Sequence, residues 1–469
     1  MVTALVTGAT GFIGSHLVRA LLQRGYTVRC LVRRTSDLTP LDGLPVSAYV
    51  GDLTQPATLT TPVQGVDYVF HCAAALLVTS REEFEAANTQ GTINLLAAAE
   101  QHAGASLRRF LFVSSQAAVG PGVDTTPKDE TAPLAPMSWY GSSKKAAEEA
   151  ARQVGSRLPV TIVRPSSVYG EREKDLSQTY PIVESHIHPK LGLLSKYLVM
   201  VYVGDVVDGI IGAAESPATA GQTYFLNHPQ VLSATEVIKT IAQAMGKPWG
   251  LLVPVPLLAL KLTAPFAEFV YHYGRDRAKM TRDKAREVSQ RFWVASPAKA
   301  QRDFGWQASH TLLEGMRRTI PAYRAERYEL HAMPLERGIV SWLKFVFMGM
   351  GLGVMIETIS AIGKFYWFNP SWLAIVVALG GFGVVMGSVA MAVKNLDHRA
   401  QFLIGCLIVG GAELVNELGL HFWQFAPGWP FGITTPWVRV AVLAVPGGAV
   451  VLLLNAVLHS LYRKRLRVG

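Results

Sequence analysis

Two patterns of hydrophobic and polar residues divide the chain near residue 330. Before it, short apolar runs typical of buried strands alternate with charged stretches of helical periodicity. After it, long apolar runs follow one another at about 339–363, 371–393, 401–421 and 438–461. The pattern predicts an α/β domain over residues 1–330 and a separate all-α domain over residues 331–469.

The four apolar runs have the length of membrane-spanning helices, which need about 20 apolar residues each. Composition agrees, because 17% of the residues are charged and 50% are hydrophobic, whereas soluble proteins carry about 25% charged residues. A buried helical bundle is the alternative, and four such runs in succession disfavour it. We therefore predict an integral, multi-pass membrane protein with about four transmembrane helices.

Basic residues in the short links between these runs predict the orientation. Lys394 and Arg399 separate the second and third runs, and a basic tail over residues 463–467 follows the fourth. The link over residues 422–437 contains no Lys or Arg and three Trp. The positive-inside rule thus places the α/β domain and both termini in the cytoplasm. In agreement, the chain opens on a strand pattern and not on a signal peptide.

The net charge of +10 suits anionic lipid headgroups. Nucleic acid is not an expected partner, since no basic and aromatic cluster stands out. The predicted spans include the polar residues Glu357, Glu413, Asn416 and Glu417. Intramembrane acids are costly and often functional. The sequence leaves open whether they line a cavity, bind a headgroup or another helix, or touch interfacial water.

No metal site or disulfide framework is predicted. Cys30, Cys72 and Cys406 lie far apart in the chain, which suits a reducing compartment. The pair His186 and His188 has the spacing of two metal ligands but lacks a third ligand nearby.

The first 32 residues read as strand, glycine turn, helix and strand, at 3–7, 8–14, 15–24 and 27–32. Glycines in this context permit a tight turn and a close approach of the backbone to a pyrophosphate at the helix N-terminus. We therefore predict a Rossmann-type, doubly wound parallel sheet, with the dinucleotide-binding core mainly in residues 1–170. The candidate cofactor contacts in the turn are Gly8, Thr10, Gly11, Phe12, Ile13 and Gly14.

The residues at the end of the second strand predict the cofactor. Arg33 and Arg34 stand where an NAD site usually has an acid that binds the ribose. Guanidinium groups suit a 2′-phosphate, so NADP(H) is favoured over NAD(H), with two solvated arginines as the alternative. Further cofactor contacts are expected after the next two strands, from Asp52, Leu53, Ala73 and Ala74.

A catalytic pattern follows in the same domain. An apolar strand over residues 110–113 ends in Ser114 and Ser115, and 25 residues later Tyr140 and Lys144 lie one helical turn apart. A nearby ammonium lowers the pKa of a phenol, which then exchanges a proton with a substrate hydroxyl or carbonyl. A serine hydroxyl holds the same oxygen, and a nicotinamide cofactor carries the hydride.

Together these motifs resemble the extended short-chain dehydrogenase/reductase superfamily over about residues 1–325. The branches that it resembles most are the NAD(P)-dependent epimerase/dehydratases and the 3β-hydroxysteroid dehydrogenase-like proteins. The motifs that carry the resemblance lie at residues 7–14, 51–53, 71–74, 88–92, 113–115, 140–144 and 164–170.

The resemblance implies roles for individual residues. Tyr140 is the expected acid/base, with Lys144 as its activator and nicotinamide-ribose ligand. Ser115 is the expected ligand of the substrate oxygen, since it precedes Gly120 by five residues as the family's serine precedes its own glycine. Asn88 is expected to support a proton relay. Contacts with the nicotinamide amide are expected from Pro165 and Val168.

Two positions depart from the family pattern. Arg33 replaces a frequent acid, and Val119 replaces the aromatic residue before the glycine of the serine motif, which weakens the resemblance to sugar epimerases. The resemblance also implies a small α/β substrate lobe over about residues 171–325, which residues 203–207 join to the core. There, the apolar stretch 251–273 predicts a pocket cover, a segment on the membrane surface or a core helix. The charged stretch 275–291 predicts a solvated helix.

These observations favour a membrane-anchored, NADP(H)-dependent oxidoreductase that interconverts a secondary alcohol and a ketone. The anchor implies a hydrophobic small molecule or lipid as substrate: a sterol, an isoprenoid or a long-chain 3-oxo lipid. Two alternatives stay open. One is a nucleotide-sugar or lipid-linked-sugar epimerase or dehydratase with tightly bound NAD, and the other is a non-catalytic, cofactor-sensing membrane subunit. Assembly as a homodimer is left open too.

Overall fold

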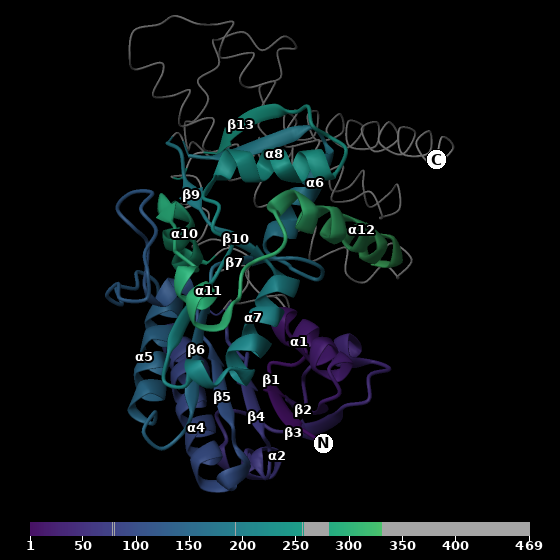
Figure 1. The fold of residues 1–469 in the computed structure, drawn as a ribbon. Helices are drawn as coiled ribbons and strands as arrows, with labels where there is room; N and C mark the ends of the chain where they lie inside the picture. The colour runs from purple at the N-terminus through teal and green to yellow at the C-terminus, as the bar shows by residue number, and fades with distance from the viewer. Residues whose placement is uncertain (77, 79, 193, 256, 258–280, 331–469) are drawn as a thin grey trace, which may run out of the picture. The chain divides into compact units, whose positions relative to one another are not determined.

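Seven parallel strands form the main sheet of the computed structural model (Figure 1), which describes residues 1–330 apart from 77, 79, 193, 256 and 258–280. The order across the sheet is β11-β6-β5-β4-β1-β2-β3. Successive strands proceed outward in both directions from β1 and β4, so a crevice opens between these two at their carboxyl ends. The strands are β1 (Thr3–Thr7), β2 (Thr27–Val32), β3 (Ser47–Val50), β4 (Tyr68–His71), β5 (Arg109–Val113), β6 (Val160–Pro165) and β11 (Thr223–Leu226).

Helices cover both faces of this sheet, which explains why its strands are apolar runs without alternation. On one face Val6 and Leu111 pack with α1 (Phe12–Gln23) and α7 (Val203–Glu215). On the other, Leu5 and Phe112 pack with α2 (Thr60–Val63), α4 (Gly91–His102) and α5 (Trp139–Gln153). The predicted Rossmann-type, doubly wound fold is confirmed for the described residues.

The helix after the glycine turn begins at Phe12, three residues earlier than predicted. Gly11 is its N-cap, and the Gly11 carbonyl accepts both the backbone N–H of Ser15, at 3.0 Å, and the Ser15 hydroxyl, at 2.6 Å. The turn therefore runs directly into the helix.

A smaller α/β lobe stands on the carboxyl edge of the sheet (Figure 1). It has its own buried cluster, which includes Tyr180, Ile241 and Met316. Its strands pair as β7 (Ser167–Tyr169) with β10 (Met200–Tyr202), β8 (Ile187–Leu191) with β13 (Leu251–Val255), and β9 (Tyr197–Leu198) with β12 (Leu232–Ser233) and β14 (Phe292–Trp293). Its helices are α6 (Tyr180–Glu184), α8 (Ala234–Ala244), α10 (Arg282–Ser289) and α12 (Leu312–Leu330), whereas α11 (Ala298–Phe304) packs beside β11 on the main sheet.

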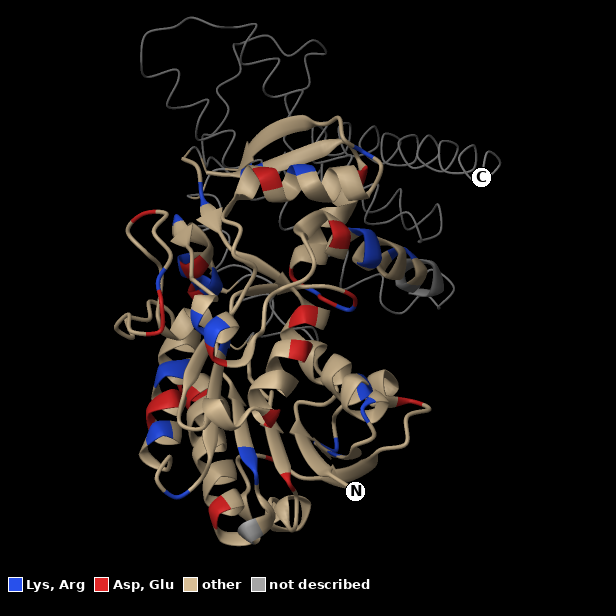
Figure 2. Ribbon diagram, in the orientation of Figure 1, with Lys and Arg blue, Asp and Glu red and all other residues tan. Residues whose placement is uncertain are grey.

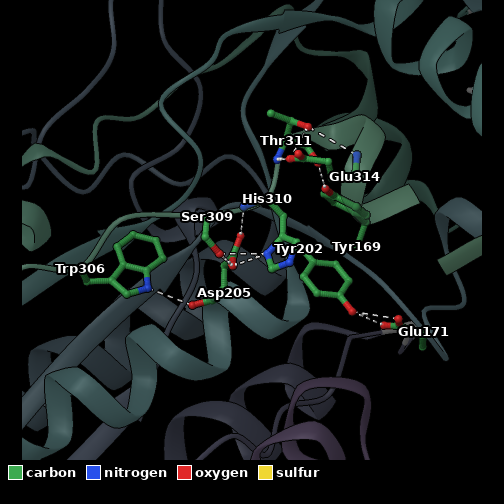
Figure 3. Close-up of polar contacts among 9 residues, drawn as sticks. All are labelled: Tyr169, Glu171, Tyr202, Asp205, Trp306, Ser309, His310, Thr311 and Glu314. Atoms are coloured by element: carbon green, nitrogen blue, oxygen red, sulfur yellow. Dashed lines mark hydrogen bonds and ion pairs between the residues drawn. The ribbon is translucent and has the colours of Figure 1, made fainter. Parts of the chain in front are cut away.

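A polar cluster fastens the loop before α12 to the first turn of α7 (Figure 3). The buried Asp205 carboxylate accepts hydrogen bonds from the Ser309 hydroxyl at 2.7 Å and from the backbone N–H of His310 at 3.0 Å. It also lies 2.7 Å from the His310 Nδ1, and the Asp205 carbonyl accepts from the Trp306 indole at 3.0 Å. Nearby, the Tyr202 hydroxyl donates to Glu171. The segment predicted to join lobe and core thus carries the buried acid of this cluster.

No helix among the described residues is long and apolar enough to cross a membrane. The four predicted spans, with the three acids and Asn416 inside them, lie outside the described residues, as do most of the apolar stretch 251–273 and the start of 275–291.

Candidate active site

The glycine turn between β1 and α1 fits the diphosphate of a dinucleotide. Gly8 has a positive φ of 68°, and a Cβ there would lie 2.7 Å from the backbone of Ala73. A Cβ on Gly14 would lie 2.1 Å from the Gly8 carbonyl oxygen. Neither position has room for a side chain. With glycine there, the backbone N–H groups at the start of α1 stay accessible to phosphates.

Replacing Gly14 with alanine is expected to raise the Kd for NAD(P)H at least about tenfold, because the new methyl group would displace the turn that faces the phosphates. Titration of cofactor fluorescence measures this. Gly212→Ala in α7 is the matched control, since its Cβ would meet the Phe304 ring at an ordinary 3.6 Å. Equal affinities of the two variants would remove the turn from the cofactor site.

Other predicted cofactor residues lie at the carboxyl ends of the strands beside this turn. Arg33 and Arg34 follow β2 and are exposed. Asp52 follows β3, and its Oδ1 accepts hydrogen bonds from the backbone and hydroxyl of Thr54 at 2.9 and 2.8 Å. Leu53 packs against Gly91 at the start of α4. All lie at the sheet edge where a dinucleotide binds in this fold.

The loop after β4 continues this edge. The backbone N–H of Ala73 donates to the Thr7 hydroxyl at 3.3 Å, which holds Ala73 beside Gly8, and Ala74 is exposed. The Gly8 backbone and this loop thus lie against each other at the point where the strand order reverses. The other predicted contacts in the glycine turn differ in their environment. Thr10 is partly buried, whereas Phe12 and Ile13 pack against the lobe's buried cluster.

The predicted nicotinamide contacts flank a residue that sequence reasoning missed. Pro165 ends β6, and Val168 lies in β7. Between them, the Ser166 hydroxyl is buried and has no hydrogen-bond partner among the described residues. A buried hydroxyl without a partner is unfavourable, so this position fits a polar group of a bound cofactor or substrate. Only the place of Ser166 in the motif of residues 164–170 could have indicated it.

Tyr140 and Ser115 meet at the same edge. Tyr140 lies in the first turn of α5, where its phenol is close enough to the Ser115 side chain for that side chain to lower the Tyr140 pKa. The neighbouring Ser114 points elsewhere, because its hydroxyl donates to the Glu148 carboxylate at 2.6 Å. Ser114 is thus engaged away from Tyr140, and the assignment of Ser115 to the substrate oxygen stays a prediction.

Lys144 lies fully buried one turn further along α5. Its ammonium donates to the Val113 carbonyl at 2.7 Å and lies 4.4 Å from the centre of the Phe112 ring. Burial lowers its pKa to about 8, against the opposing effects of Glu148 and Cys72.

The expected lowering of the Tyr140 pKa by Lys144 is not what the structure shows. Burial raises this pKa, and the carboxylate of Glu287 raises it further. The Ser115 side chain acts in the opposite direction and lowers the Tyr140 pKa. The reason for the difference is desolvation of the phenol, which spacing along a helix does not reveal.

Lys144→Met is expected to stabilise the fold at pH 7 by up to about 3 kcal/mol, since the native pKa of about 8 lies below the usual 10.5. The native state binds fewer protons than the unfolded state between these values, so the wild type gains stability there as pH rises. The advantage of the variant should therefore shrink between pH 8 and 10.5. Thermal unfolding of the full chain across this range measures the difference, and a constant or negative advantage would contradict it.

Asn88 joins two parts of the site from a π-helical turn, η3 (Glu85–Gln90). Its Oδ1 accepts the backbone N–H of Ala75 at 2.7 Å. Its Nδ2 donates to the Ala75 carbonyl and to the Ser143 hydroxyl, both at 3.0 Å. Asn88 thus links the loop after β4 to α5, next to Lys144. The proton-relay role stays a prediction.

His71 at the end of β4 is a structural residue. It is buried, and its ring nitrogens lie 2.7 Å from the Thr7 hydroxyl and 2.9 Å from the Thr92 hydroxyl. Burial lowers its pKa to about 3, so the ring stays neutral. Elsewhere in the described residues, no group of three or more His, Cys, Asp or Glu side chains has the arrangement of a metal site, and this includes His186 and His188.

The prediction of a solvated helix over residues 275–291 is wrong for α10. Asp283 is buried, and its carboxylate accepts the backbone N–H groups of Trp139 and Tyr140 at 2.8 and 3.2 Å. Ser138 caps α5 by accepting from Gly141 and also donates to Glu287. Acids at a helix N-terminus accept hydrogen bonds from its free N–H groups and interact favourably with the helix dipole. The lobe thus holds the helix turn that carries Tyr140.

Comparison with known proteins identifies the family of this chain. The model of the NAD dependent epimerase/dehydratase family fits residues 4–226. A 3-beta-hydroxysteroid dehydrogenase of Mycolicibacterium neoaurum is 30% identical over 338 residues, covering 68% of this chain and 90% of the relative. This chain belongs to the NAD dependent epimerase/dehydratase family. It is an NAD(P)-dependent oxidoreductase of the short-chain dehydrogenase/reductase type.

Other members of the epimerase/dehydratase family show its breadth. A UDP-glucose 4-epimerase of Vibrio cholerae is 30% identical, covering 68% of this chain and 94% of the relative. A ceramide reductase of Caulobacter vibrioides is 29% identical with the same shares. Among solved structures, the dTDP-glucose 4,6-dehydratase DesIV of Streptomyces venezuelae with NAD and TYD bound has a TM-score of 0.56 and 25% identity, over 69% of this chain and 98% of DesIV.

Proposed function

We propose that this epimerase/dehydratase family member is a membrane-anchored, NADP(H)-dependent oxidoreductase that interconverts a secondary alcohol and its ketone on a hydrophobic substrate. The substrate class is a sterol, an isoprenoid or a long-chain 3-oxo lipid. The observation that carries the chemistry is the proximity of the Tyr140 phenol to the Ser115 side chain, with buried Lys144 one helical turn along α5, at the edge that also holds the glycine turn.

The mechanism divides the work between the cofactor and the chain. When bound, the nicotinamide supplies or accepts the hydride. Ser115 holds the substrate oxygen and keeps it next to the Tyr140 hydroxyl, which gives or takes the proton at that oxygen. The Lys144 ammonium, held by the Val113 carbonyl one helical turn from Tyr140, would bind the nicotinamide ribose and supply positive charge on the Tyr140 side of α5.

The cofactor preference for NADP(H) rests on Arg33 and Arg34. Changing both to serine is expected to weaken NADPH binding about 10- to 100-fold, because a hydrogen bond to a charged group contributes about 1.5–3 kcal/mol. NADH binding should change less than about threefold. Titrations of both cofactors check this, with Arg157→Ser, an exposed residue paired with Glu100, as the control for loss of positive charge. Equal losses for NADPH and NADH would refute the preference.

The apolar substrate class rests on two independent observations. The 3-beta-hydroxysteroid dehydrogenase and the ceramide reductase, by their names, act on lipids and are about as similar to this chain as the sugar-nucleotide epimerase is. In addition, the four apolar runs after residue 338 are long enough to span a bilayer. An anchor of this kind keeps the cytoplasmic lobe beside the layer in which such substrates dissolve.

The test compares lipids from cells that contain the wild-type chain with lipids from cells that contain Tyr140→Phe, by mass spectrometry. One apolar alcohol and ketone pair should shift by two mass units between them, and membrane extracts should support NADPH consumption only with the wild type. Identical lipid profiles and no cofactor consumption would overturn the proposal.

A nucleotide-sugar epimerase or dehydratase is the second candidate, favoured by the 30% identity to the Vibrio cholerae UDP-glucose 4-epimerase. It predicts tightly retained NAD and sugar conversion without net cofactor consumption. The released cofactor of the purified, heat-denatured chain therefore separates the two candidates: a stoichiometric amount of NAD supports the sugar enzyme, and its absence supports the lipid enzyme.

A further inference from the structure

Among the described residues, the two-stranded ribbon of β8 and β13 in the lobe (Figure 1) presents an exposed apolar face. Alternate residues of one strand, and paired residues of adjacent strands, lie on the same face. The register therefore groups six apolar side chains, here called the ribbon face: Ile187, Pro189, Leu191, Leu251, Val253 and Val255. None of the six carries a charge or a polar side-chain atom.

The opposite face of the ribbon is covered on β8 but not on β13. His188 on that face is only 4% exposed, and α8 packs against β8, whereas its partner Leu252 is 44% exposed. On the ribbon face Leu251 is 66% exposed and Ile187 is 40% exposed. Figure 2 shows that β13 carries no Lys, Arg, Asp or Glu. Large exposed apolar surfaces mark sites that bind a partner or a membrane.

Two further exposed residues extend the ribbon face at its ends. Trp249, two residues before Leu251, is 76% exposed, and Leu194, shortly after β8, is 63% exposed. The Trp249 backbone is held in place, because its carbonyl lies 2.8 Å from the His186 Nδ1 and its ring lies 5.9 Å from the His186 ring. The indole is thus presented beside the ribbon face by a fixed loop.

We propose that the ribbon face and Trp249 dock on the interface of a lipid bilayer. Tryptophan concentrates at membrane interfaces, where its amphipathic ring sits at the level of the headgroups. Lys247 lies two residues before Trp249, and a basic residue beside an apolar surface favours anionic headgroups. A bilayer is also within reach, since the first bilayer-length apolar run begins nine residues after α12 ends.

This inference rests on the proposed function and adds to it a route for the substrate. The ribbon belongs to the lobe whose α10 caps the helix of Tyr140. Docking of this lobe on lipid would place the substrate side of the site against the layer that dissolves a sterol or a long-chain ketone. Transfer of an apolar substrate would then avoid water, which disfavours exposed apolar area by about 25 cal/mol per Å².

The test uses the full chain in vesicles of phosphatidylcholine and phosphatidylglycerol, with a single environment-sensitive fluorophore on an introduced cysteine. Trp249→Cys and Leu194→Cys report on the proposed surface, and both positions are exposed enough to change without opening the core. Ile93→Cys, 37% exposed on α4 in the dinucleotide half, is the control. The parent chain, treated with the same label, corrects for Cys30, Cys72 and Cys406.

Labels at 249 and 194 are expected to emit at shorter wavelength than the label at 93, and brominated lipids should quench them at least twofold more strongly. Quenching by aqueous iodide equal to that at position 93 would overturn the proposal. Blue-shifted emission that resists both quenchers would also overturn it, because protein would then cover the surface. An alkaline wash tests the anchor separately: a chain that leaves the vesicles refutes the anchor, while quenching at neutral pH still decides the docking.

Discussion

A Tyr140→Phe variant is expected to lose about 100- to 10,000-fold in turnover, the range that a positioned general acid or base contributes. Only the phenolic oxygen is removed, so the ring contact with Phe84, at 6.0 Å between centres, can persist. Affinity for NADP(H) should change less than about threefold, because the glycine turn and the arginines after β2 are untouched. NADPH consumption with the lipid substrate, and cofactor titration without it, measure the two effects.

The matched control for this variant is Tyr26→Phe. The Tyr26 hydroxyl donates to Glu215 on the surface, away from the site. Its removal should leave turnover within about twofold of the wild type. If Tyr140→Phe were equally active, the acid/base assignment would fail. If Tyr140→Phe also lost the cofactor, its primary role would be binding and not proton transfer.

The sheet was predictable because strands that are buried on both faces appear in the sequence as continuous apolar runs. β1, β4 and β5 are such runs, and each ends in small or polar residues where the chain leaves the sheet. The site edge followed from them, since carboxyl ends of parallel strands meet at one edge. Helix starts were less predictable: α1 begins inside the glycine turn because Gly11 serves as its N-cap.

Sequence predicts only those site residues that share one helix or lie at the end of one strand. Tyr140 and Lys144 share a helix, and Ser115 follows a strand, so periodicity and topology place them together. Asp283 is different, because it reaches Tyr140 across 143 residues of chain. Its local sequence alternates charges like any solvated helix, and nothing in that pattern reveals the N–H groups that it caps.

The direction of a pKa shift was likewise beyond the sequence. Spacing shows that an ammonium and a phenol are neighbours, but not how much water surrounds them. In the structure Lys144 is buried against Phe112 and the Val113 carbonyl, and burial dominates the pKa values of both Lys144 and Tyr140. Tertiary packing therefore decides the direction of these pKa shifts, which the motif alone does not reveal.

Glu148→Leu is expected to destabilise the fold by about 3–5 kcal/mol, the effect of leaving one partner of a buried ion pair without the other. Glu148 is fully buried and binds the buried Arg164 through Nε at 2.9 Å and Nη2 at 2.7 Å. Its other partners are Ser114 and Arg152. The Arg164 Nη1 has no partner among the described residues, so this guanidinium depends strongly on Glu148.

The control is Glu149→Leu, since Glu149 is exposed and its Lys145 partner lies 3.9 Å away. That change should alter stability by no more than about 1 kcal/mol. The double variant Glu148→Leu/Arg164→Leu should recover most of the lost stability, because it leaves no unpaired charge of this ion pair in the protein interior. Thermal unfolding of the full chain followed by near-ultraviolet circular dichroism measures all four proteins.

Equal melting of the two single glutamate variants would show that the pair is not a stabilising contact. The pair also has a consequence for catalysis. Glu148 lies one turn after Lys144, binds the residue before Ser115, and binds Arg164 directly before Pro165. One carboxylate thus links α5, β5 and β6, which carry the proposed acid/base, the proposed substrate serine and the proposed nicotinamide loop. Turnover of the double variant should therefore stay low even where its stability returns, which separates folding from the alignment of the site.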